Sequence, residues 1–509
     1  MLDITRIWME SGLVPREGQA RISLQIAEYL SEGKSVALSA PTGWGKTIVT
    51  LIALKSSKLI PALWLIRSLS IGNRILIDAE KIKLRAIVLA GKEKCCLKVL
   101  EDEIEQDDVY EYCRRARYKC NYYLNIKPRN TVEATTYLEL IDYLRPLKIC
   151  PYYVQELLVG DVIVQNYYRR RRSVKCTVID EAHNIVQPRE IAIRVDKLND
   201  VIADLKRSPL VHSSSVHEVE RFYRWLRDLD EGIVDPLLFL SEGTIREIGR
   251  AYVEYLDAGI KTRIGSLLRI LRCDVLYKEG DELVGFNATK INIPKPSVLL
   301  SGTLFPELLN ILKPDEIIEV PYRKRRAIIL DFLTSKYGEF EETSNLKEYR
   351  EVLRLMRRKF HRVVAFGSWR VVKVLKGEAD FVEVLPREWS GLLMLKARGR
   401  FSEGVDIPAD VIIVLGAPYL TPEVIRRLMD GYLRIGLSTE EARNVASDIL
   451  MLLTTIQCIG RTIRDPSSNP LIILADYRFK KQKALEKFFE IELAKDLRHL
   501  ENIITKKYK

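Results

Sequence analysis

The segment from Ser35 to Leu54, SVALSAPTGWGKTIVTLIAL, decides the fold class of this 509-residue chain. A short apolar run is followed by a glycine-bearing loop and then by the pattern of an amphipathic helix. Within the segment, Ala40–Thr47 (APTGWGKT) fits the phosphate-loop pattern, with Ala in place of the first Gly. A chance Gly-Lys-Thr in a turn would lack the strand before it and the helix after it. The segment therefore predicts an α/β domain whose parallel sheet binds a nucleotide.

Each residue of this loop has a chemical task. Gly43 and Gly45 let the backbone N–H groups turn inward and surround phosphate oxygens at the start of a helix. Lys46 can reach the β- and γ-phosphates, and the Thr47 hydroxyl can ligate Mg²⁺. The predicted nucleotide-binding residues of the loop are Thr42, Gly43, Gly45, Lys46 and Thr47.

The second half of such a site is an acidic pair at the end of a hydrophobic strand. In CTVIDEAHNI, residues Cys176–Ile179 form the predicted strand, and Asp180 and Glu181 follow it. Ligands of open α/β sheets bind at that edge. Asp180 can hold Mg²⁺ through water, while Glu181 can polarise the attacking water. Taken alone, DEAH could also begin a solvated helix.

The amino-acid composition limits the classes of protein to which the chain can belong. A chain with 47% hydrophobic and 29% charged residues is typical of a soluble globular protein, and 509 residues suffice for three or four domains. We find no apolar run long enough to cross a membrane and no signal-peptide pattern, so we expect a cytoplasmic location. The net charge of +12 favours a polyanionic partner, with a solvated basic surface as an equal alternative.

Cysteines are concentrated in one region. Five of the eight lie between positions 95 and 150: Cys95, Cys96, Cys113, Cys120 and Cys150. In a reducing cytosol, clustered thiols indicate a metal centre or redox chemistry more often than disulfides. The intervals do not separate an iron–sulfur cluster from tetrathiolate zinc, and reduced core thiols are a third alternative.

Further motifs give the chain a family resemblance. APTGWGKT and VIDEAH resemble motifs I and II (the DEAH box) of superfamily 2 helicases. The remaining motifs follow in order: PREGQ, ending at Gln19, resembles the adenine-reading Q motif, SGT (301–303) motif III, VVAFGSW (363–369) motif IV, GRFSEGVDIP (399–408) motif V and QCIGRTIR (457–464) motif VI.

Motif VI has a clear physical rationale. Arg461 and Arg464 are three residues apart and Gln457 lies one turn earlier, so all three share one helix face. From a second lobe they can reach the γ-phosphate and stabilise the transition state. The alternative is a basic helix face exposed to water. The predicted catalytic residues are Lys46, Asp180, Glu181, Arg461 and Arg464, and the resemblance adds Gln19, Asp406 and Gln457 to the nucleotide site.

The cysteines narrow the resemblance to XPD/DinG-type (Rad3-related) iron–sulfur DNA helicases. In that family a cluster domain lies between motif Ia, whose position Arg67 and Ser68 occupy here, and motif II, and its fourth cysteine opens a CPYY-like segment, as Cys150 does here. The resemblance implies a [4Fe–4S] cluster on Cys96, Cys113, Cys120 and Cys150, with Cys95 as the alternative first ligand. It further implies ATP and Mg²⁺ as cofactors and a monomeric DNA-repair helicase that moves 5′ to 3′ on single-stranded and forked DNA.

The expected fold is α/β, with two RecA-like, doubly wound parallel-sheet lobes, an inserted iron–sulfur domain and a short helical arch-like insertion. The expected boundaries are 1–94, 151–198 and 286–320 for lobe 1, 95–150 for the iron–sulfur domain, 199–285 for the arch-like insertion and 321–509 for lobe 2. From Tyr477 onward we expect a long terminal helix.

DNA contacts are expected along both lobes. NYYRRRRS (166–173) places tyrosines beside arginines, which suits phosphate contact and base stacking, although a solvated loop with core tyrosines is the alternative. The predicted DNA-binding residues are Arg67, Asn166, Tyr167, Arg169 and Ser368. Two other functions stay open: an ATP-driven translocase or remodeller, RNA-directed or not, that does not unwind duplex, and a non-catalytic DNA-binding scaffold.

Overall fold

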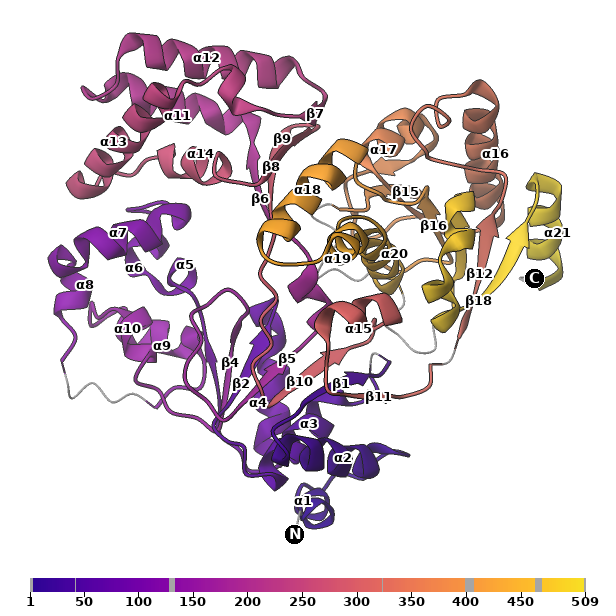
Figure 1. Cartoon of the computed structure of the whole chain (residues 1–509), viewed down its shortest axis with the longest axis horizontal. Helices are drawn as coiled ribbons and strands as arrows, with labels where there is room; N and C mark the ends of the chain where they lie inside the picture. The colour runs from indigo at the N-terminus through magenta and orange to yellow at the C-terminus, as the bar shows by residue number, and fades with distance from the viewer. Residues whose placement is uncertain are drawn as a thin grey trace.

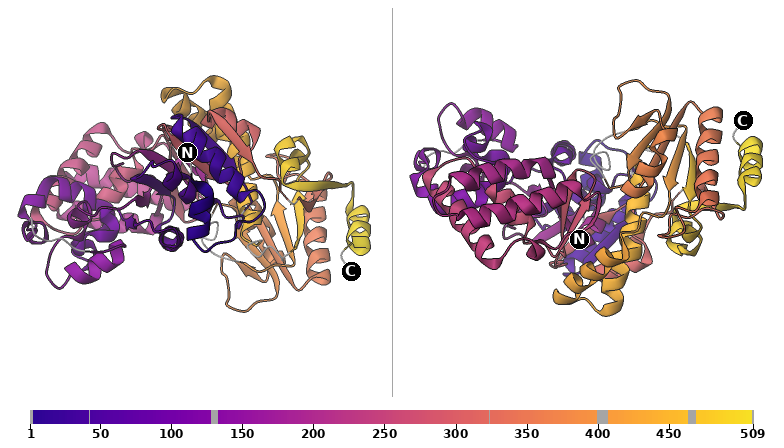
Figure 2. Two further views of the ribbon diagram at one scale, coloured as in Figure 1. Left: turned by 90° about the horizontal axis from the view of Figure 1, so that it is seen from below. Right: turned by 90° about the horizontal axis from the view of Figure 1, so that it is seen from above.

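The structure is a computed structural model that describes residues 3–41, 43–127, 133–322, 324–398, 407–462 and 469–507. Two lobes lie side by side, and two insertions extend from the first lobe, the second of them reaching α18 of lobe 2 (Figure 1). The C-terminal helix lies at the outer edge of lobe 2, far from the N-terminus (Figure 2).

Lobe 1 is built on a seven-stranded parallel sheet with the strand order β11-β1-β10-β5-β2-β4-β3. Its strands are β1 (Ser35–Ser39), β2 (Ala62–Ile66), β3 (Ala86–Leu89), β4 (Val162–Asn166), β5 (Cys176–Ile179), β10 (Ser297–Ser301) and β11 (Glu316–Glu319). Its helices are α1 (Ile4–Glu10), α2 (Gln19–Ser31), α3 (Lys46–Ser56), α4 (Gly72–Lys81) and α15 (Pro306–Leu312). The central strands are buried throughout because helices cover both faces, as parallel sheets require.

Lobe 2 repeats this architecture, with the strand order β14-β15-β13-β16-β17-β12-β18. Its strands are β12 (Arg325–Leu330), β13 (Arg362–Gly367), β14 (Phe381–Val382), β15 (Gly391–Lys396), β16 (Val411–Leu415), β17 (Leu471–Ala475) and β18 (Phe489–Ala494). Its helices are α16 (Thr343–Lys359), α17 (Trp369–Leu375), α18 (Pro422–Arg434), α19 (Thr439–Asn444), α20 (Leu450–Gly460) and α21 (Leu497–Lys507). Every strand pair in both lobes is parallel, which confirms the predicted fold class.

The prediction of a long helix from Tyr477 is wrong. The described tail forms β18, which pairs with β12 at the sheet edge, and only then α21. Between Phe489 and Leu493, apolar residues alternate with Glu490 and Glu492, and that two-residue period is typical of a strand.

The first insertion carries the clustered cysteines on short helices. These are α5 (Lys92–Cys95), α6 (Leu97–Leu100), α7 (Val109–Ala116), α8 (Asn121–Leu124), α9 (Tyr137–Leu144) and α10 (Pro151–Gln155).

The second insertion contains the expected helices and also a sheet that was not expected. Its helices are α11 (Leu198–Arg207), α12 (Ser213–Asp228), α13 (Glu242–Ala258) and α14 (Ile264–Ile270). An antiparallel sheet of order β6-β9-β8-β7 lies beneath them, formed by β6 (Arg189–Arg194), β7 (Glu231–Ile233), β8 (Val275–Glu279) and β9 (Glu282–Asn287). Gly280, at φ 59°, makes the tight turn between β8 and β9.

The two insertions contact each other through α7 and α13 and the loops beside them. Arg115 forms a two-pronged ion pair with Asp257 (3.0 and 2.8 Å), and Arg263 pairs with Glu105 at 2.6 Å. Small apolar side chains, including Val109 and Leu256, pack beneath these charges. The two insertions, which both leave and re-enter lobe 1, therefore also pack directly against each other.

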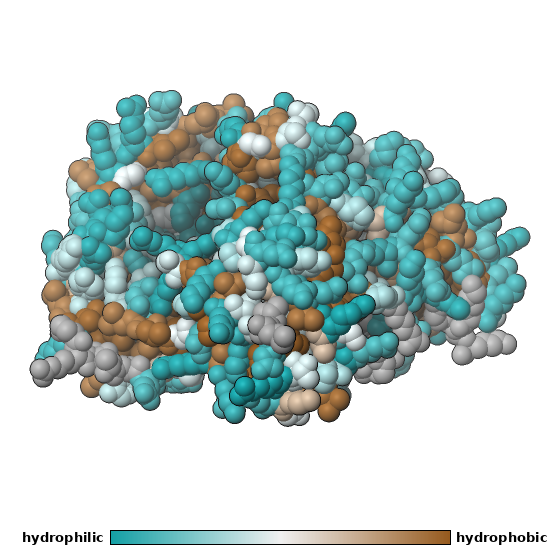
Figure 3. All heavy atoms as spheres, turned by 60° about the horizontal axis from the view of Figure 1, so that its bottom comes forward, coloured by the Kyte–Doolittle hydropathy of each residue, from teal (hydrophilic) through white to brown (hydrophobic). Residues whose placement is uncertain are grey.

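The surface seen in Figure 3 is mainly hydrophilic, with hydrophobic side chains gathered in separate groups. Among the described helices, none combines the length and the apolarity needed to span a membrane.

Candidate nucleotide and nucleic-acid site

The phosphate loop joins β1 to α3 at the carboxyl edge of the lobe 1 sheet. Gly43 and Gly45 have positive φ angles of 79° and 103°, which side chains other than glycine rarely adopt. Lys46 Nζ donates to the carbonyl oxygens of Ala40 (2.9 Å) and Pro41 (3.3 Å), so the amine lies over the loop. Thr47 follows in the first turn of α3, and the predicted contact Thr42 lies outside the described residues.

Gln19 is buried at the start of α2 and holds this loop. Its side-chain nitrogen donates to the carbonyl of Trp44 (2.5 Å), and its oxygen accepts from the backbone N–H of Arg16 (2.7 Å). A Cβ on Gly45 would approach Gln19 Nε2 to 2.5 Å, so a larger residue there would displace the Gln19 amide from the loop. Gln19 therefore links the expected adenine side of the site to the phosphate loop.

Asp180 and Glu181 follow β5 directly, two strands away from β1. Burial and the neighbouring Glu181 charge raise the pKa of Asp180 to about 6, although the Lys46 ammonium opposes the shift. Burial also raises the pKa of Glu181, again against the Lys46 charge. The structure therefore brings the lysine of motif I and both carboxylates of motif II into one electrostatic group.

His183 is a part of the site that sequence reasoning did not include. Ser301 Oγ and Thr303 Oγ1 of motif III each lie 2.8 Å from its Nδ1. Burial and the charges of Arg67 and Lys46 lower the pKa of His183 to about 3, so the ring is neutral at physiological pH. The histidine of DEAH and the two hydroxyl residues of SGT were the sequence features that could have predicted this contact.

Lobe 2 reaches the same site through α20. Gln457 Nε2 lies 3.5 Å from His183 Nε2 and 3.5 Å from Asn184 Oδ1, so motif VI meets motif II across the lobe boundary. Arg461 follows at the end of α20. Arg464 and Asp406, which are also predicted site residues, lie outside the described residues.

Three of the predicted DNA contacts gather at the carboxyl edge of lobe 1. Arg67 is exposed directly after β2, and its carbonyl accepts from Asn166 Nδ2 at 2.5 Å. The Tyr167 hydroxyl donates to the backbone carbonyls of Asp180 and Glu181. Tyr167 thus supports the backbone of motif II, and Arg67 and Asn166 offer polar groups to solvent beside it.

Arg169 does not fit its predicted role. Its side chain is 4% exposed and bonds Glu156, the carbonyl of Ala90 (3.1 Å) and Gln165 Oε1 (2.9 Å). Because these partners enclose the guanidinium, no surface is left for DNA, and we correct the prediction for this residue.

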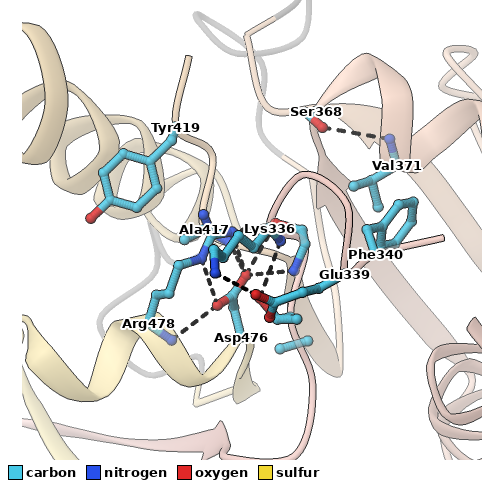
Figure 4. A network of polar contacts seen from close by, with 12 residues as sticks. Lys336, Glu339, Phe340, Ser368, Val371, Ala417, Tyr419, Asp476 and Arg478 are labelled. Carbon is cyan, nitrogen blue, oxygen red and sulfur yellow. Dashed lines mark hydrogen bonds and ion pairs between the residues drawn. The ribbon is translucent and has the colours of Figure 1, made fainter. Parts of the chain in front are cut away.

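Ser368 caps α17 at the carboxyl edge of lobe 2, where its Oγ accepts from the N–H of Val371 at 3.5 Å (Figure 4). The same edge is organised around buried Asp476, which accepts from the N–H groups of Ser335 (2.8 Å) and Ala417 (3.1 Å) and from Arg478. Burial alone would raise the pKa of Asp476, but the Arg478 charge and these bonds hold the pKa below its ordinary value.

The four predicted cluster ligands lie near one another in the first insertion. Cys96 lies within electrostatic range of Cys113 and Cys120, and Cys150 within range of Cys96 and Cys120. Cys96, Cys120 and Cys150 each precede a short helix. Burial raises the pKa of Cys96 to about 11 and that of Cys150 to about 12, while backbone N–H groups of those helices act against the shift.

Cys95 faces Gln155, although it lies within electrostatic range of Cys150. Its thiol is fully buried and lies 3.8 Å from Gln155 Oε1, and Gln155 in turn bonds both the N–H and the carbonyl of Ala90. Of the two adjacent thiols, Cys96 is therefore the one placed with Cys113 and Cys120.

The cysteine group does not form a closed ion site by itself. In the part of the chain that the structure describes, no three His, Cys, Asp or Glu side chains are close enough together to hold a metal ion. The cluster assignment therefore rests on the chemistry of four neighbouring thiols, which suits iron–sulfur ligation, and stays a prediction.

Comparisons with known proteins agree with this arrangement. Residues 350–492 match the family of helicase C-terminal domains. The ATP-dependent DNA helicase XPD of Sulfolobus acidocaldarius is 24% identical, over 91% of this chain and 96% of that protein. A solved structure named XPD helicase superposes with a TM-score of 0.70 at 21% identity, covering 95% of this chain and 100% of the other. A structure of S. tokodaii Xpd4 gives a TM-score of 0.57 at 18% identity, covering 94% and 100%.

The solved structures confirm the two-lobe fold. The sequence match and the C-terminal domain agree with the resemblance that the motifs indicated and support an ATP-dependent helicase enzyme.

Proposed function

We propose that this chain is an XPD/Rad3-type helicase that hydrolyses ATP to move 5′ to 3′ along single-stranded DNA and to unwind duplex, with DNA repair as its setting. The observation that carries the proposal is the meeting of three motifs at one lobe boundary. Lys46 acts on Asp180 and Glu181 within lobe 1, and Gln457 of lobe 2 lies 3.5 Å from His183 beside them.

In the proposed reaction, Lys46 binds the β- and γ-phosphates and Glu181 orients the attacking water. Thr47 and Asp180 would hold Mg²⁺, which supplies positive charge to the phosphates when it is bound. Arg461 and Arg464 act from lobe 2 on the charge that develops at the γ-phosphate. Because His183 is neutral and contacts both motif III and Gln457, it can relay a change at the phosphates to lobe 2 without carrying charge itself.

The proposed strand path crosses the carboxyl edges of both sheets. Lobe 1 offers Arg67 and Asn166, with Tyr167 supporting the motif II backbone beside them, and lobe 2 offers Ser368. Arg370, two residues after Ser368, has its guanidinium 5.1 Å from the ring of Tyr337, which is 77% exposed. An exposed ring next to a cation suits base stacking and phosphate contact.

We assign the predicted cluster to Cys96, Cys113, Cys120 and Cys150. When bound, a cluster would tie four separated chain positions into one rigid unit. The apolar core beneath α7 is small and is shared with Leu256 of the second insertion, so such a tie would make the first insertion a firm wedge for separating strands. The ion-paired contact between the two insertions supports the same role, because it braces the wedge against the second insertion.

The test is strand separation with matched duplexes that carry a 5′ or a 3′ single-stranded tail. We expect ATP-dependent unwinding of the 5′-tailed duplex alone, and its loss in Lys46→Ala together with ATP hydrolysis. Lys81→Ala is the matched control, because Lys81 forms only a surface ion pair with Asp78. DNA-stimulated hydrolysis without strand separation would favour the translocase alternative, and the absence of any hydrolysis would favour the scaffold.

A further inference from the structure

Two neighbouring cavities lie at the amino-terminal edge of the lobe 1 sheet, opposite the edge of the nucleotide site. One, of about 320 Å³, is bounded by the start of β5 and by the loop 171–175. The other, of about 400 Å³, is bounded by Ser35 at the start of β1 and by the loop after α18. Asn292 and Lys295, in the segment between β9 and β10, line both cavities. We call these two cavities, which share part of one wall, the basic groove.

Positive charge dominates the basic groove. Its cationic lining residues are Arg171, Arg172, Lys175, Lys290, Lys295 and Lys313. Among the described residues that line it, Glu441 is the single carboxylate.

Three of these cations are held by acidic neighbours. Lys295 pairs with Asp315 (2.5 Å), Lys313 with Glu441 (2.7 Å) and Arg172 with Glu156 (3.3 Å). Such pairs balance charge and fix the walls of the groove.

The other three have no carboxylate partner within the described ranges. Arg171 donates to the carbonyl of Asn292 at 3.3 Å, and Lys175 to the carbonyl of Lys58 at 3.4 Å. Lys290 is exposed and has neither an ion pair nor a side-chain hydrogen bond there. All three cations are exposed, so their charge is available to an anionic ligand from solution.

The character of the lining indicates which polyanion fits. No aromatic side chain is among the described lining residues, so the groove offers no face on which unpaired bases could stack. Single-strand sites combine positive charge with such faces, whereas contact to phosphates alone is how proteins hold a duplex backbone without reading its sequence. We propose that the basic groove binds the sugar–phosphate backbone of duplex nucleic acid, away from the ATP-dependent strand path.

The test measures binding of a blunt-ended DNA duplex to the full chain without ATP, by fluorescence anisotropy over a range of NaCl concentrations. In the triple variant R171E/K175E/K290E we expect about a tenfold or greater loss of affinity. The slope of log affinity against log salt should fall by about 0.9 for each phosphate that the variant no longer neutralises. The neutral variant R171Q/K175Q/K290Q should show a smaller loss of affinity and a smaller fall in the salt slope. Because all three side chains are exposed, both triple variants should keep the fold.

Lys347→Glu, on the exposed face of α16, is the matched control and should leave duplex binding unchanged. Oligo(dT) binding, measured in parallel, should change much less than duplex binding in the triple variant. Unchanged duplex affinity and salt slope in both triple variants would overturn the proposal, and so would an equal loss for oligo(dT). Because the assay contains no ATP, its outcome is independent of whether the chain unwinds DNA.

Discussion

Arg67 donates a hydrogen bond from Nη1 to Asn184 Oδ1 across 2.7 Å and so joins the end of β2 to the turn that follows Asp180 and Glu181. The same Asn184 oxygen lies 3.5 Å from Gln457 of lobe 2. Asn184 therefore contacts both a proposed DNA-binding residue and the second lobe, and it follows the acidic pair in the chain. A shift of Arg67 or of Gln457 would move Asn184 and, through it, the turn that carries Asp180 and Glu181.

We expect Asn184→Ala to lower DNA-stimulated ATP hydrolysis by about tenfold, because a hydrogen bond to a charged group contributes about 1.5–3 kcal/mol. Basal hydrolysis should fall less, since Asn184 contacts neither Lys46 nor the carboxylates in the described structure. Steady-state hydrolysis with and without oligo(dT) measures both rates. Gln187→Ala is the control, because Gln187 also donates to Asn184 Oδ1 (3.2 Å) but lacks the link to Arg67. Equal losses of both rates would contradict the coupling role.

Arg461→Ala should reduce ATP hydrolysis by about 10³-fold or more while ATP binding is retained, because the arginine acts on charge that develops in the transition state. The comparison of kcat with nucleotide affinity separates this effect from weakened binding. Arg443→Ala, an exposed arginine on α19, should behave as wild type. A rise in KM with unchanged kcat would show that Arg461 serves ground-state binding instead.

The cysteines allow a matched comparison of adjacent residues. Cys113→Ser and Cys96→Ser should each remove the visible iron–sulfur absorption and impair unwinding more than ATP hydrolysis, since each removes a cluster ligand. Cys95→Ser should keep the absorption, because Cys95 faces Gln155. Absorption and iron content of the purified variants measure this directly. A colourless wild-type protein that contains stoichiometric zinc would contradict the cluster assignment.

Asp108 makes the contact between the insertions sensitive to pH. It accepts from the Tyr252 hydroxyl (3.0 Å) and packs against Gly265, and burial, with the charges of Asp107 and Glu105, raises its pKa to about 7 against the Arg269 charge. A separated Asp108 would return to a pKa near 3.8. The docked state therefore keeps its proton while the separated state loses it. The contribution of Asp108 to the contact is greatest below pH 4, and up to about 4 kcal/mol of it is lost as pH rises to 7.

Asp108→Asn should remove this pH dependence and tighten the contact at pH 7.5, because the amide oxygen still accepts from Tyr252 without a buried charge. Hydrogen exchange of the α13 amides, corrected for the intrinsic effect of pH, measures the contact. Asp102→Asn is the control, since its pair with Lys261 is exposed and contributes little. Faster exchange at pH 7.5 in Asp108→Asn than in wild type would contradict the prediction.

Much of the site was readable from the sequence because its signals are local. The strand before Ala40, the glycines of the loop and the acidic pair after Cys176–Ile179 each depend on neighbours along the chain, and the structure has them as expected. Strand β18 and the β8–β9 hairpin were missed, because short alternating segments next to helical patterns carry a weak signal and are decided by an available sheet edge or partner strand.

The sequence by itself determined the two parallel-sheet lobes, the phosphate loop and the group of cysteines, since hydrophobic period, glycine position and residue type act within a few residues. Only the tertiary structure decided which of those side chains face one another. Adjacent Cys95 and Cys96 are chemically identical in the sequence, yet one packs on Gln155 and the other lies beside Cys113 and Cys120. In the sequence Arg169 cannot be distinguished from the neighbouring arginines, but in the fold Glu156 and the carbonyl of Ala90 enclose its guanidinium. The reason is the same in both cases: burial and partners come from distant parts of the chain, which only the packed fold brings together.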